Sequence, residues 1–215
     1  MNFLLKTLSM SLPNIIIDAV ALSCGYFVRI LSKRSNTVAD SKIRGAFMGP
    51  RFGARKLRIS RGVLFSGIRD ISLGNGVSIY TGSQIIAGTH GKVTIGDYSH
   101  ISRNSVLAGA GEIEVGSHSK ISSGVMIYTV TYDRTAAPLL RDCPVKLAKV
   151  TIGNDVHIGA NATILPGVHI ADNATVGAGA VVTKNVEEGV TVIGSPAKPV
   201  KKLSLIHISE PTRPY

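Results

Sequence analysis

The chain has 215 residues, enough for one domain with a sizeable core, and 44% of them are hydrophobic although aromatic residues make up only 5%. This shortage of aromatic side chains argues against a protein that binds nucleic acid by stacking bases. The two cysteines, Cys24 and Cys143, fit neither a metal-binding nor a redox spacing, so we expect reduced thiols in a cytoplasmic protein.

The formal charge of +11 is concentrated in the N-terminal third. Residues 1–62 contain eleven Lys or Arg and two Asp, which gives +9 and leaves +2 for residues 63–215. Such a basic segment predicts an acidic neighbour: lipid headgroups, nucleic acid, or the phosphates of a nucleotide-linked substrate. A solvated basic surface without a partner remains the alternative.

The first predicted element is an apolar helix over residues 12–31, interrupted by Asp18 and Arg29. Its uncharged stretch is too short to span a bilayer, and no signal-peptide cleavage site follows it. Two interpretations remain open, a helix that caps the end of the fold and an interfacial helix at the inner face of the membrane. We therefore treat residues 1–56 as a separate basic, hydrophobic and helical segment.

Residues 57–202 contain a repeat with a period of six. A branched aliphatic residue recurs at every sixth position from residue 150 onward, and earlier triplets keep the same step. Every third residue of this series falls on the same side of a coil, so the series divides into three columns. The columns are Leu73, Ile95, Val115, Ile152 and Ile170; Ile79, Ile101, Ile121, Ile158 and Val176; and Ile85, Leu107, Ile127, Ile164 and Val182.

A period of six fits neither an α-helix, which repeats every 3.6 residues, nor a continuous strand, which repeats every two. It fits a short strand followed by a turn, three of which close a triangular coil of 18 residues. One aliphatic side chain per side then points inward, and stacked coils bury columns of like residues. We predict five coils, with a partial coil at residues 57–70, in an all-β parallel β-helix.

Two irregular segments interrupt or follow the repeat. The step between Ile127 and Ile152 is 25 residues, which predicts a long loop over residues 128–149, and long loops on economical solenoids are usually functional. Residues 203–215 fit no coil and resemble a translated vector tail, so we exclude them from functional reasoning.

The stretches 150–168 and 176–186, and the ending Gly194-Ser195-Pro196-Ala197-Lys198, resemble the hexapeptide-repeat acetyltransferases. The likeness covers residues 71–202 and is greatest to galactoside and maltose O-acetyltransferases and to sugar acetyltransferases of surface-polysaccharide clusters. It implies a left-handed β-helix, a homotrimer, and acetyl-CoA as co-substrate in the groove between subunits. The acceptor would be a sugar hydroxyl or amine, free or linked to a nucleotide or lipid.

The resemblance also implies residues that bind the donor. Ala160 and Ala178 match small positions that let the pantetheine arm approach the backbone. Thr183 and Lys184 match a Thr-Lys pair near the adenine and phosphates of CoA, and Lys198 adds positive charge for the phosphates. A purely structural role for Thr183 and Lys184 in closing the last coil is the alternative.

The catalytic position departs from the family. In the resembled enzymes a His at the start of the long loop acts as general base, whereas Tyr132 takes its place here and residues 128–149 contain no His. A Tyr has an ordinary pKa of about 10 and is a poor base. Three alternatives stay open: His157 or His100 is the base, the acceptor is an amine that needs no protein base, or the chain is an inactive scaffold.

No metal site is predicted. A γ-class carbonic anhydrase shares the β-helix, but it needs two closely spaced zinc-binding histidines. Here His100 and His118 stand 18 residues apart without a close partner. The sequence therefore favours an acyltransferase over a metalloenzyme.

Overall fold

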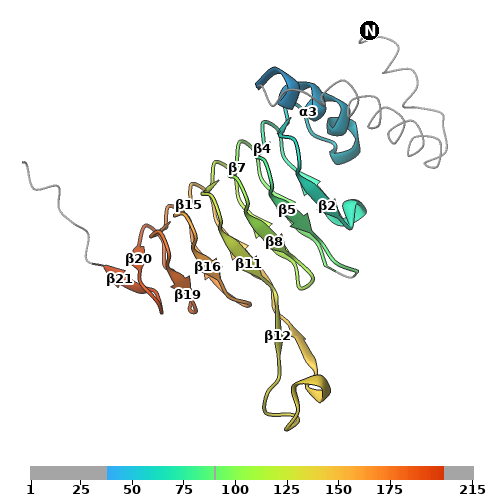
Figure 1. Cartoon of the computed structure of the whole chain (residues 1–215). Helices are drawn as coiled ribbons and strands as arrows, with labels where there is room; N and C mark the ends of the chain where they lie inside the picture. Colours follow the sequence, from blue (N-terminus) through green and yellow to red (C-terminus); the bar gives the residue numbers. More distant parts are fainter. Residues whose placement is uncertain (1–37, 90, 201–215) are drawn as a thin grey trace, which may run out of the picture.

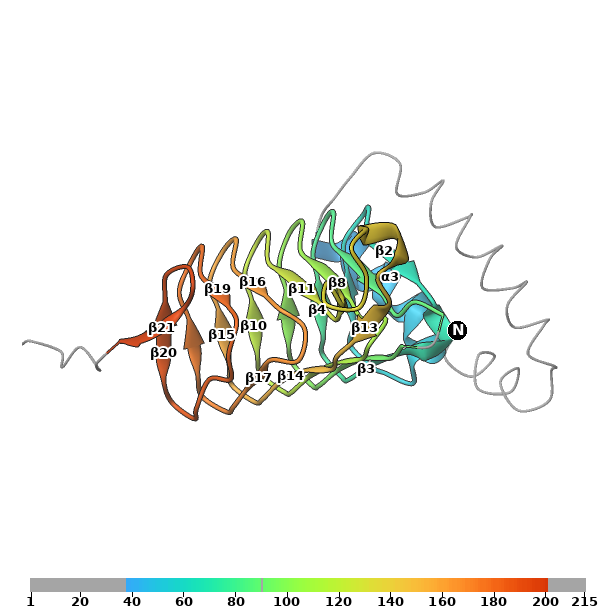
Figure 2. The same ribbon diagram turned by 90° about the horizontal axis from the view of Figure 1, so that it is seen from below.

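The computed structural model describes residues 38–89 and 91–200, and shows a triangular solenoid with one helix at its N-terminal end (Figures 1 and 2). The predictions for residues 12–31 and 203–215 lie outside the described residues. Successive coils stack in parallel, and their short strands form three flat sides. The predicted hexapeptide-repeat β-helix is confirmed.

The three sides are parallel sheets, named here sheets A, B and C. Sheet A contains β1 (Arg58–Ile59), β4 (Ser78–Ile79), β7 (His100–Ile101), β10 (Lys120–Ile121), β15 (His157–Ile158), β18 (Thr175–Val176), β20 (Thr191–Ile193) and the antiparallel β21 (Lys198–Val200). Sheet B contains β2 (Leu64–Ser66), β5 (Gln84–Ile86), β8 (Val106–Ala108), β11 (Met126–Tyr128), β16 (Thr163–Ile164) and β19 (Val181–Val182). Sheet C contains β3 (Ile71–Leu73), β6 (Val93–Ile95), β9 (Ile113–Val115), β14 (Val150–Ile152) and β17 (His169–Ile170).

The aliphatic columns predicted from the period are register partners in these sheets. In sheet A, for example, Ile101 pairs with Ile121 and Ile121 with Ile158, and all three side chains are at most 1% exposed. Each inward column is continuous, because a parallel in-register stack places identical repeat positions above one another. The same stacking leaves the alternate residue of each strand pointing outward, where it is free to serve function.

The solenoid has about seven turns, more than the five and a partial one predicted. The additional turn begins at Val186, which bridges Ile170 in parallel, and continues to Val192, which pairs with Val176. Val186 follows Val182 after four residues instead of six. The shortened corner breaks the period, and for this reason the repeat pattern alone missed the last turn.

Helix α3 (Val38–Phe52) closes the N-terminal end of the core. Gly45 and Gly49 face the backbone after the helix, and a Cβ atom at Gly49 would lie 2.7 Å from the Ala54 carbonyl oxygen. Phe52 packs against Phe65 with ring centroids 5.3 Å apart. The helix thus covers apolar side chains that the first coil would otherwise expose. Among the described residues, no helix combines the length and apolar character needed to span a bilayer.

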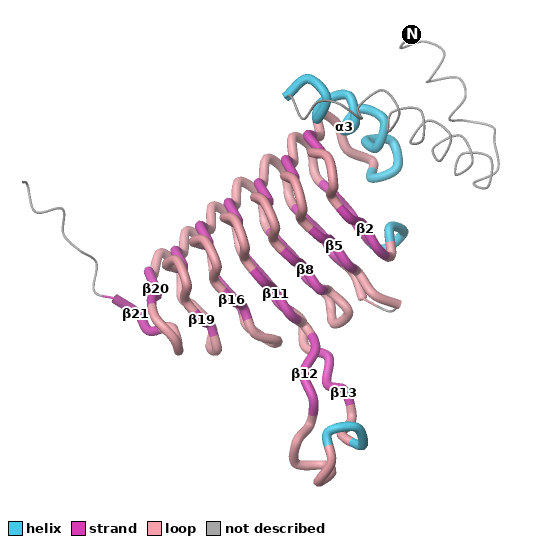
Figure 3. The backbone as a smooth tube through the Cα atoms, in the orientation of Figure 1, coloured by secondary structure: helices cyan, strands magenta, loops and turns pink. Residues whose placement is uncertain are grey.

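The predicted loop over residues 128–149 is a β-hairpin that projects away from the solenoid (Figures 1 and 3). Its strands, β12 (Val130–Tyr132) and β13 (Val145–Leu147), pair in antiparallel orientation. Two short 3₁₀ turns complete the described structure, η2 (Leu140–Asp142) near the hairpin tip and η1 (Ile68–Asp70) in the first coil.

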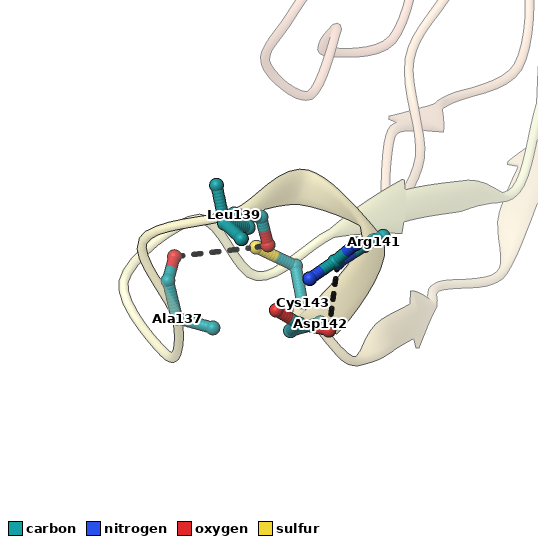
Figure 4. Close-up of polar contacts among 5 residues, drawn as sticks. All are labelled: Ala137, Leu139, Arg141, Asp142 and Cys143. Carbon is teal, nitrogen blue, oxygen red and sulfur yellow. Dashed lines mark hydrogen bonds and ion pairs between the residues drawn. The ribbon is translucent and has the colours of Figure 1, made fainter.

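Local contacts hold both ends of the hairpin. At the tip, the Cys143 thiol approaches the carbonyl oxygens of Ala137 at 3.5 Å and Leu139 at 3.4 Å (Figure 4). At the base, the Lys149 ammonium group lies 2.8 Å from Glu114 on β9. The hairpin is therefore an ordered projection with its own contacts.

Candidate active site on the outer face of sheet A

A hollow of about 400 Å³ lies on the outer face of sheet A. It extends across the middle strands of the sheet, β7, β10 and β15, and reaches the corner that leads toward sheet B. The residues that line it are Tyr80, His100, Ser102, Arg103, Lys120, Ser122, Ser123 and His157.

Parallel register brings the two predicted histidines to the same hollow. Lys120 pairs with His100 on one side and with His157 on the other, so the three outward side chains form a row. Strands in a sheet are about 4.8 Å apart, which places the two histidine backbones roughly 10 Å from each other. The two imidazoles thus belong to the same hollow, on either side of Lys120.

The environment of His100 lowers its pKa below the ordinary value of 6.5. Desolvation by partial burial is the main cause, and the positive charges of Lys120 and Arg58 add to it. A lowered pKa keeps the imidazole neutral near pH 7, which is the form that can accept a proton. Tyr80 stacks on the same ring, with centroids 6.5 Å apart and an interplanar angle of 22°.

The charge of the hollow favours an anionic ligand. Arg103 and Lys120 contribute two cations, three serines contribute hydroxyl groups, and none of the eight lining residues is acidic. Phosphate groups are well matched to such a set of cations and hydroxyl donors. The hollow therefore suits a phosphorylated acceptor or part of a phosphorylated donor.

Tyr132 is not among the residues that line this hollow. It lies on β12 of the hairpin, pairs with Val145, and is 49% exposed. Its neighbour Asp133 forms a 2.7 Å ion pair with Lys146. Hydrogen bonds from Lys146 and Thr135 lower the pKa of Asp133 to about 2. Within one chain, the structure thus separates Tyr132 from the two predicted histidines.

The residues expected to bind the donor lie toward the C-terminal end of the solenoid. Ala160 and Ala178 stack at the corner between sheets A and B, where the Gly179 N–H group donates to the Ala160 carbonyl at 2.8 Å. Thr183 and Lys184 are exposed at the next corner, between sheets B and C. The Ala197 N–H group donates to the Val181 carbonyl at 2.8 Å, so Lys198 lies beside the strand that leads to Thr183.

Sequence reasoning missed six residues of the hollow, although the repeat contained a signal for them. Lys120 occupies the same repeat position as His100 and His157, directly before the buried aliphatic residue of its coil. Tyr80, Ser102 and Ser122 directly follow that aliphatic residue, and Arg103 and Ser123 come one position later. Mapping polar residues by repeat position would have found the whole group.

Across residues 38–89 and 91–200, no group of three or more His, Cys, Asp or Glu side chains is arranged to hold a metal ion. The chemistry of the described hollow is that of imidazoles, cations and hydroxyls.

Comparison with known proteins agrees with the fold. The family described as bacterial transferase hexapeptide (six repeats) matches residues 149–184. A curated relative, the dTDP-4-amino-4,6-dideoxy-D-glucose acyltransferase of Escherichia coli, is 31% identical over 163 residues, which cover 73% of this chain and 84% of the relative.

Solved structures of acyltransferases also match this chain. AntD, an N-acyltransferase from Bacillus cereus in complex with dTDP and 3-hydroxybutyryl-CoA, matches with a TM-score of 0.64 and 29% identity over 74% of this chain and 87% of its own. The predicted CoA co-substrate agrees with that complex. A maltose O-acetyltransferase from Clostridium difficile matches with a TM-score of 0.56, covering 88% of this chain and 89% of its own, but at 22% identity it shows the fold alone. With its repeat, its stacked coils and a relative matched over most of both chains, this protein belongs to the hexapeptide-repeat acyltransferases.

Proposed function

We propose that this protein transfers an acyl group from a CoA thioester to the amino group of a nucleotide-linked sugar. Acetyl is the acyl group expected from the sequence, and the making of surface polysaccharide is the expected setting. The central observation is that the hairpin, where the O-acetyltransferases of this family place their catalytic His, contains none in residues 128–149. A neutral amine can attack without first losing a proton, so an amine acceptor does not need a base at that position.

The chemistry supports this choice. A neutral sugar amine is a sufficient nucleophile for a thioester carbonyl, whereas a hydroxyl group requires a base to remove its proton. As the amine nitrogen bonds to the carbonyl carbon, the C–S bond breaks and CoA leaves as a thiolate. The nitrogen gives up one proton, and the neutral imidazole of His100 is the acceptor we assign to it. We assign His157, across Lys120, to binding of the acceptor.

The relatives support an amino-sugar acceptor. The E. coli relative is named as an acyltransferase of dTDP-4-amino-4,6-dideoxy-D-glucose, and AntD is an N-acyltransferase bound to dTDP. The cations and hydroxyl groups of the sheet A hollow offer partners for a diphosphate in this chain. We therefore assign that hollow to the acceptor, with Tyr80 and Arg103 among its binding residues.

The donor site is proposed along the C-terminal coils. The small residues Ala160 and Ala178 leave backbone groups accessible to a pantetheine arm. Thr183, Lys184 and Lys198 are exposed within two neighbouring segments and provide a hydroxyl and two cations for the CoA phosphates.

A homotrimer completes the proposed site. The hairpin carries half-exposed apolar side chains, and an isolated two-stranded hairpin is marginally stable in water. These side chains are Tyr132, Leu139, Leu140, Val145 and Leu147. A neighbouring subunit would cover them and would place Tyr132 of one chain against the acceptor site of another.

The experiment compares two acceptors that differ in one non-hydrogen atom. Purified protein is incubated with acetyl-CoA and either a dTDP-linked 4-amino-4,6-dideoxy sugar or the matching 4-hydroxy sugar, and released CoA thiol is followed by its absorbance after reaction with a disulfide reagent. We expect thiol release with the amine and release at least about 100-fold slower with the alcohol, the size of a typical contribution from general-base catalysis.

Faster turnover with the alcohol would overturn the proposal in favour of O-acetyl transfer. The remaining alternative is a scaffold without activity, and calorimetry with CoA distinguishes it. Binding of CoA without thiol release for any amino sugar in a panel of nucleotide-linked acceptors would show a donor site without catalysis.

A further inference from the structure

We propose that the outer face of helix α3, together with Arg55 and Lys56, docks on a membrane surface that contains anionic phospholipids. This surface lies at the N-terminal end of the solenoid, opposite the end formed by β20 and β21 (Figures 1 and 3). The proposal does not depend on the acceptor assigned above.

Helix α3 has two different faces. Ser41, Gly45, Gly49 and Phe52 are buried against the first coil, and the Arg44 side chain donates from Nε to the Ile59 carbonyl at 2.8 Å. This face is packed against the first coil, so the helix cannot rotate to bury its other side without losing these contacts.

The opposite face exposes large apolar side chains. Ile43 and Phe47 are 50% and 51% exposed, and a spacing of four residues places them next to each other on the helix surface. Ala46 and Pro50 continue the same exposed stripe. Exposed pairs of this kind insert between lipid headgroups, where they leave water without needing a protein partner.

Positive charge surrounds this apolar stripe. Residues 38–62 contain seven Lys or Arg and one Asp, a net charge of +6 within 25 residues. Lys42 and Arg51 are exposed on α3, and Arg55 and Lys56 follow it directly. Each Lys or Arg near an anionic bilayer strengthens binding to it. The charge therefore complements an anionic surface.

A hollow of about 360 Å³ lies where the helix meets these cations. It is lined by Ala46, Gly49, Pro50, Arg55 and Lys56, among other residues. The two cations on one side and the short side chains of the helix on the other leave room for a phosphate headgroup. The apolar pair next to it distinguishes a bilayer from a soluble phosphate, which would leave Phe47 in water.

The chain offers one rival occupant of its own. The apolar residues 12–31 precede α3 in the sequence and lie outside the described residues. If they covered Ile43 and Phe47 as a cap, these side chains would contribute to stability and not to membrane binding. The experiment separates the two cases.

The test is co-sedimentation of the full-length protein with vesicles of phosphatidylcholine, with and without phosphatidylglycerol. We expect binding to the anionic vesicles only, with an affinity that falls as salt rises. The double variants Ile43→Ser/Phe47→Ser and Arg55→Ser/Lys56→Ser are each expected to weaken the apparent affinity roughly tenfold or more. Inorganic phosphate, compared with chloride at the same ionic strength, is not expected to compete.

Two exposed residues on other parts of the solenoid provide matched controls. Ile193→Ser removes an apolar side chain that is 49% exposed on β20, and Lys92→Ser removes an exposed cation outside α3. Both are expected to bind vesicles like the wild type. Unchanged vesicle binding in Ile43→Ser/Phe47→Ser would overturn the proposal. Unchanged binding with a lower melting temperature would in addition show that these two side chains contribute to stability, as a covering segment of the protein requires.

Discussion

His100 and Lys120 are direct register partners on the neighbouring parallel strands β7 and β10, with both side chains on the outer face of sheet A. Burial and the nearby positive charges lower the pKa of His100. The stacking of coils thus places a neutral imidazole beside a cation. No motif in the sequence pairs these two residues; their register alone does.

The first prediction concerns protonation of His100. Its imidazole should titrate below pH 6.5 in the folded protein, measured by NMR and assigned with His100→Gln. Lys120→Ser should move this pKa upward only in part, because desolvation is the larger cause. A titration at or above pH 6.5 in the wild type would contradict this account of the site.

The same shift sets the sign of two pH effects. Because the unfolded chain takes up this proton at a higher pH than the folded one, the contribution of His100 to stability falls as the pH drops from about 6.5 toward the folded pKa. If His100 accepts the amine proton, kcat should fall as the pH drops through the folded pKa of His100, at the lower end of this range and below it. Lys120→Ser should then shift the acid limb of the kcat profile in the same direction as the pKa.

A second prediction addresses the donor. Lys184→Glu should weaken CoA binding about tenfold, equivalent to about 1.4 kcal/mol, because it places a negative charge beside the CoA phosphates. Lys184 is exposed and outside the aliphatic columns, so the melting temperature should not change. Calorimetry measures the affinity, and Lys92→Glu is the matched control on another part of the solenoid. Equal affinity in both variants would remove Lys184 from the donor site.

A third prediction separates two roles for Tyr132. If its hydroxyl only orients the acceptor, Tyr132→Phe should cost about one buried hydrogen bond, roughly 1–3 kcal/mol in kcat/KM, with much of kcat retained. Tyr132→His should create or raise acetyl transfer to sugar hydroxyls if the base position of the family can still be used. Loss of all turnover in Tyr132→Phe, with CoA binding intact, would identify Tyr132 as a catalytic group.

Assembly gives a fourth prediction. Light scattering of the purified protein at micromolar concentration should give three times the mass of one chain. Leu139→Ser/Leu147→Ser removes two side chains that are 51% and 52% exposed on the hairpin, and should shift the equilibrium toward monomer. Ile193→Ser, with similar exposure on β20, should leave the mass unchanged. A wild-type monomer would exclude an acceptor site shared between subunits.

A fifth prediction tests how α3 closes the core. Gly45→Ala should lower the free energy of unfolding by roughly 1–3 kcal/mol, because its Cβ would collide with the Leu57 carbonyl group and backbone atoms cannot move aside cheaply. Thermal denaturation measures the loss. Ala46→Ser, the adjacent and exposed position, should change stability by no more than about 0.5 kcal/mol. Equal effects of the two substitutions would show that α3 does not pack closely on the first coil.

Most of the fold was predictable because its local rule is short. Each coil places an aliphatic residue at the same repeat position, so Ile101, Ile121 and Ile158 could be assigned to one buried column from spacing alone. The rule failed where spacing changed. The four-residue step from Val182 to Val186 concealed the last turn, although that turn pairs in parallel with the preceding coil in sheets A and C.

The candidate site was predictable only in part. His100 and His157 could be named as candidates from the sequence. However, 56 residues lie between them, and these include the hairpin. Only the stacking of coils shows that both flank Lys120 and that Tyr132 lies elsewhere in the chain.

The sequence by itself determined the β-helix, its columns, the position of the long excursion and the absence of a His within it. These features depend on neighbours within one coil, so the period of six and its interruptions predict them directly. Tertiary structure alone decided which outward side chains share a hollow, how the excursion pairs as a hairpin, and which face of α3 is buried. Those properties depend on which coils and segments come into contact, and burial and charge become defined only after such contacts exclude water.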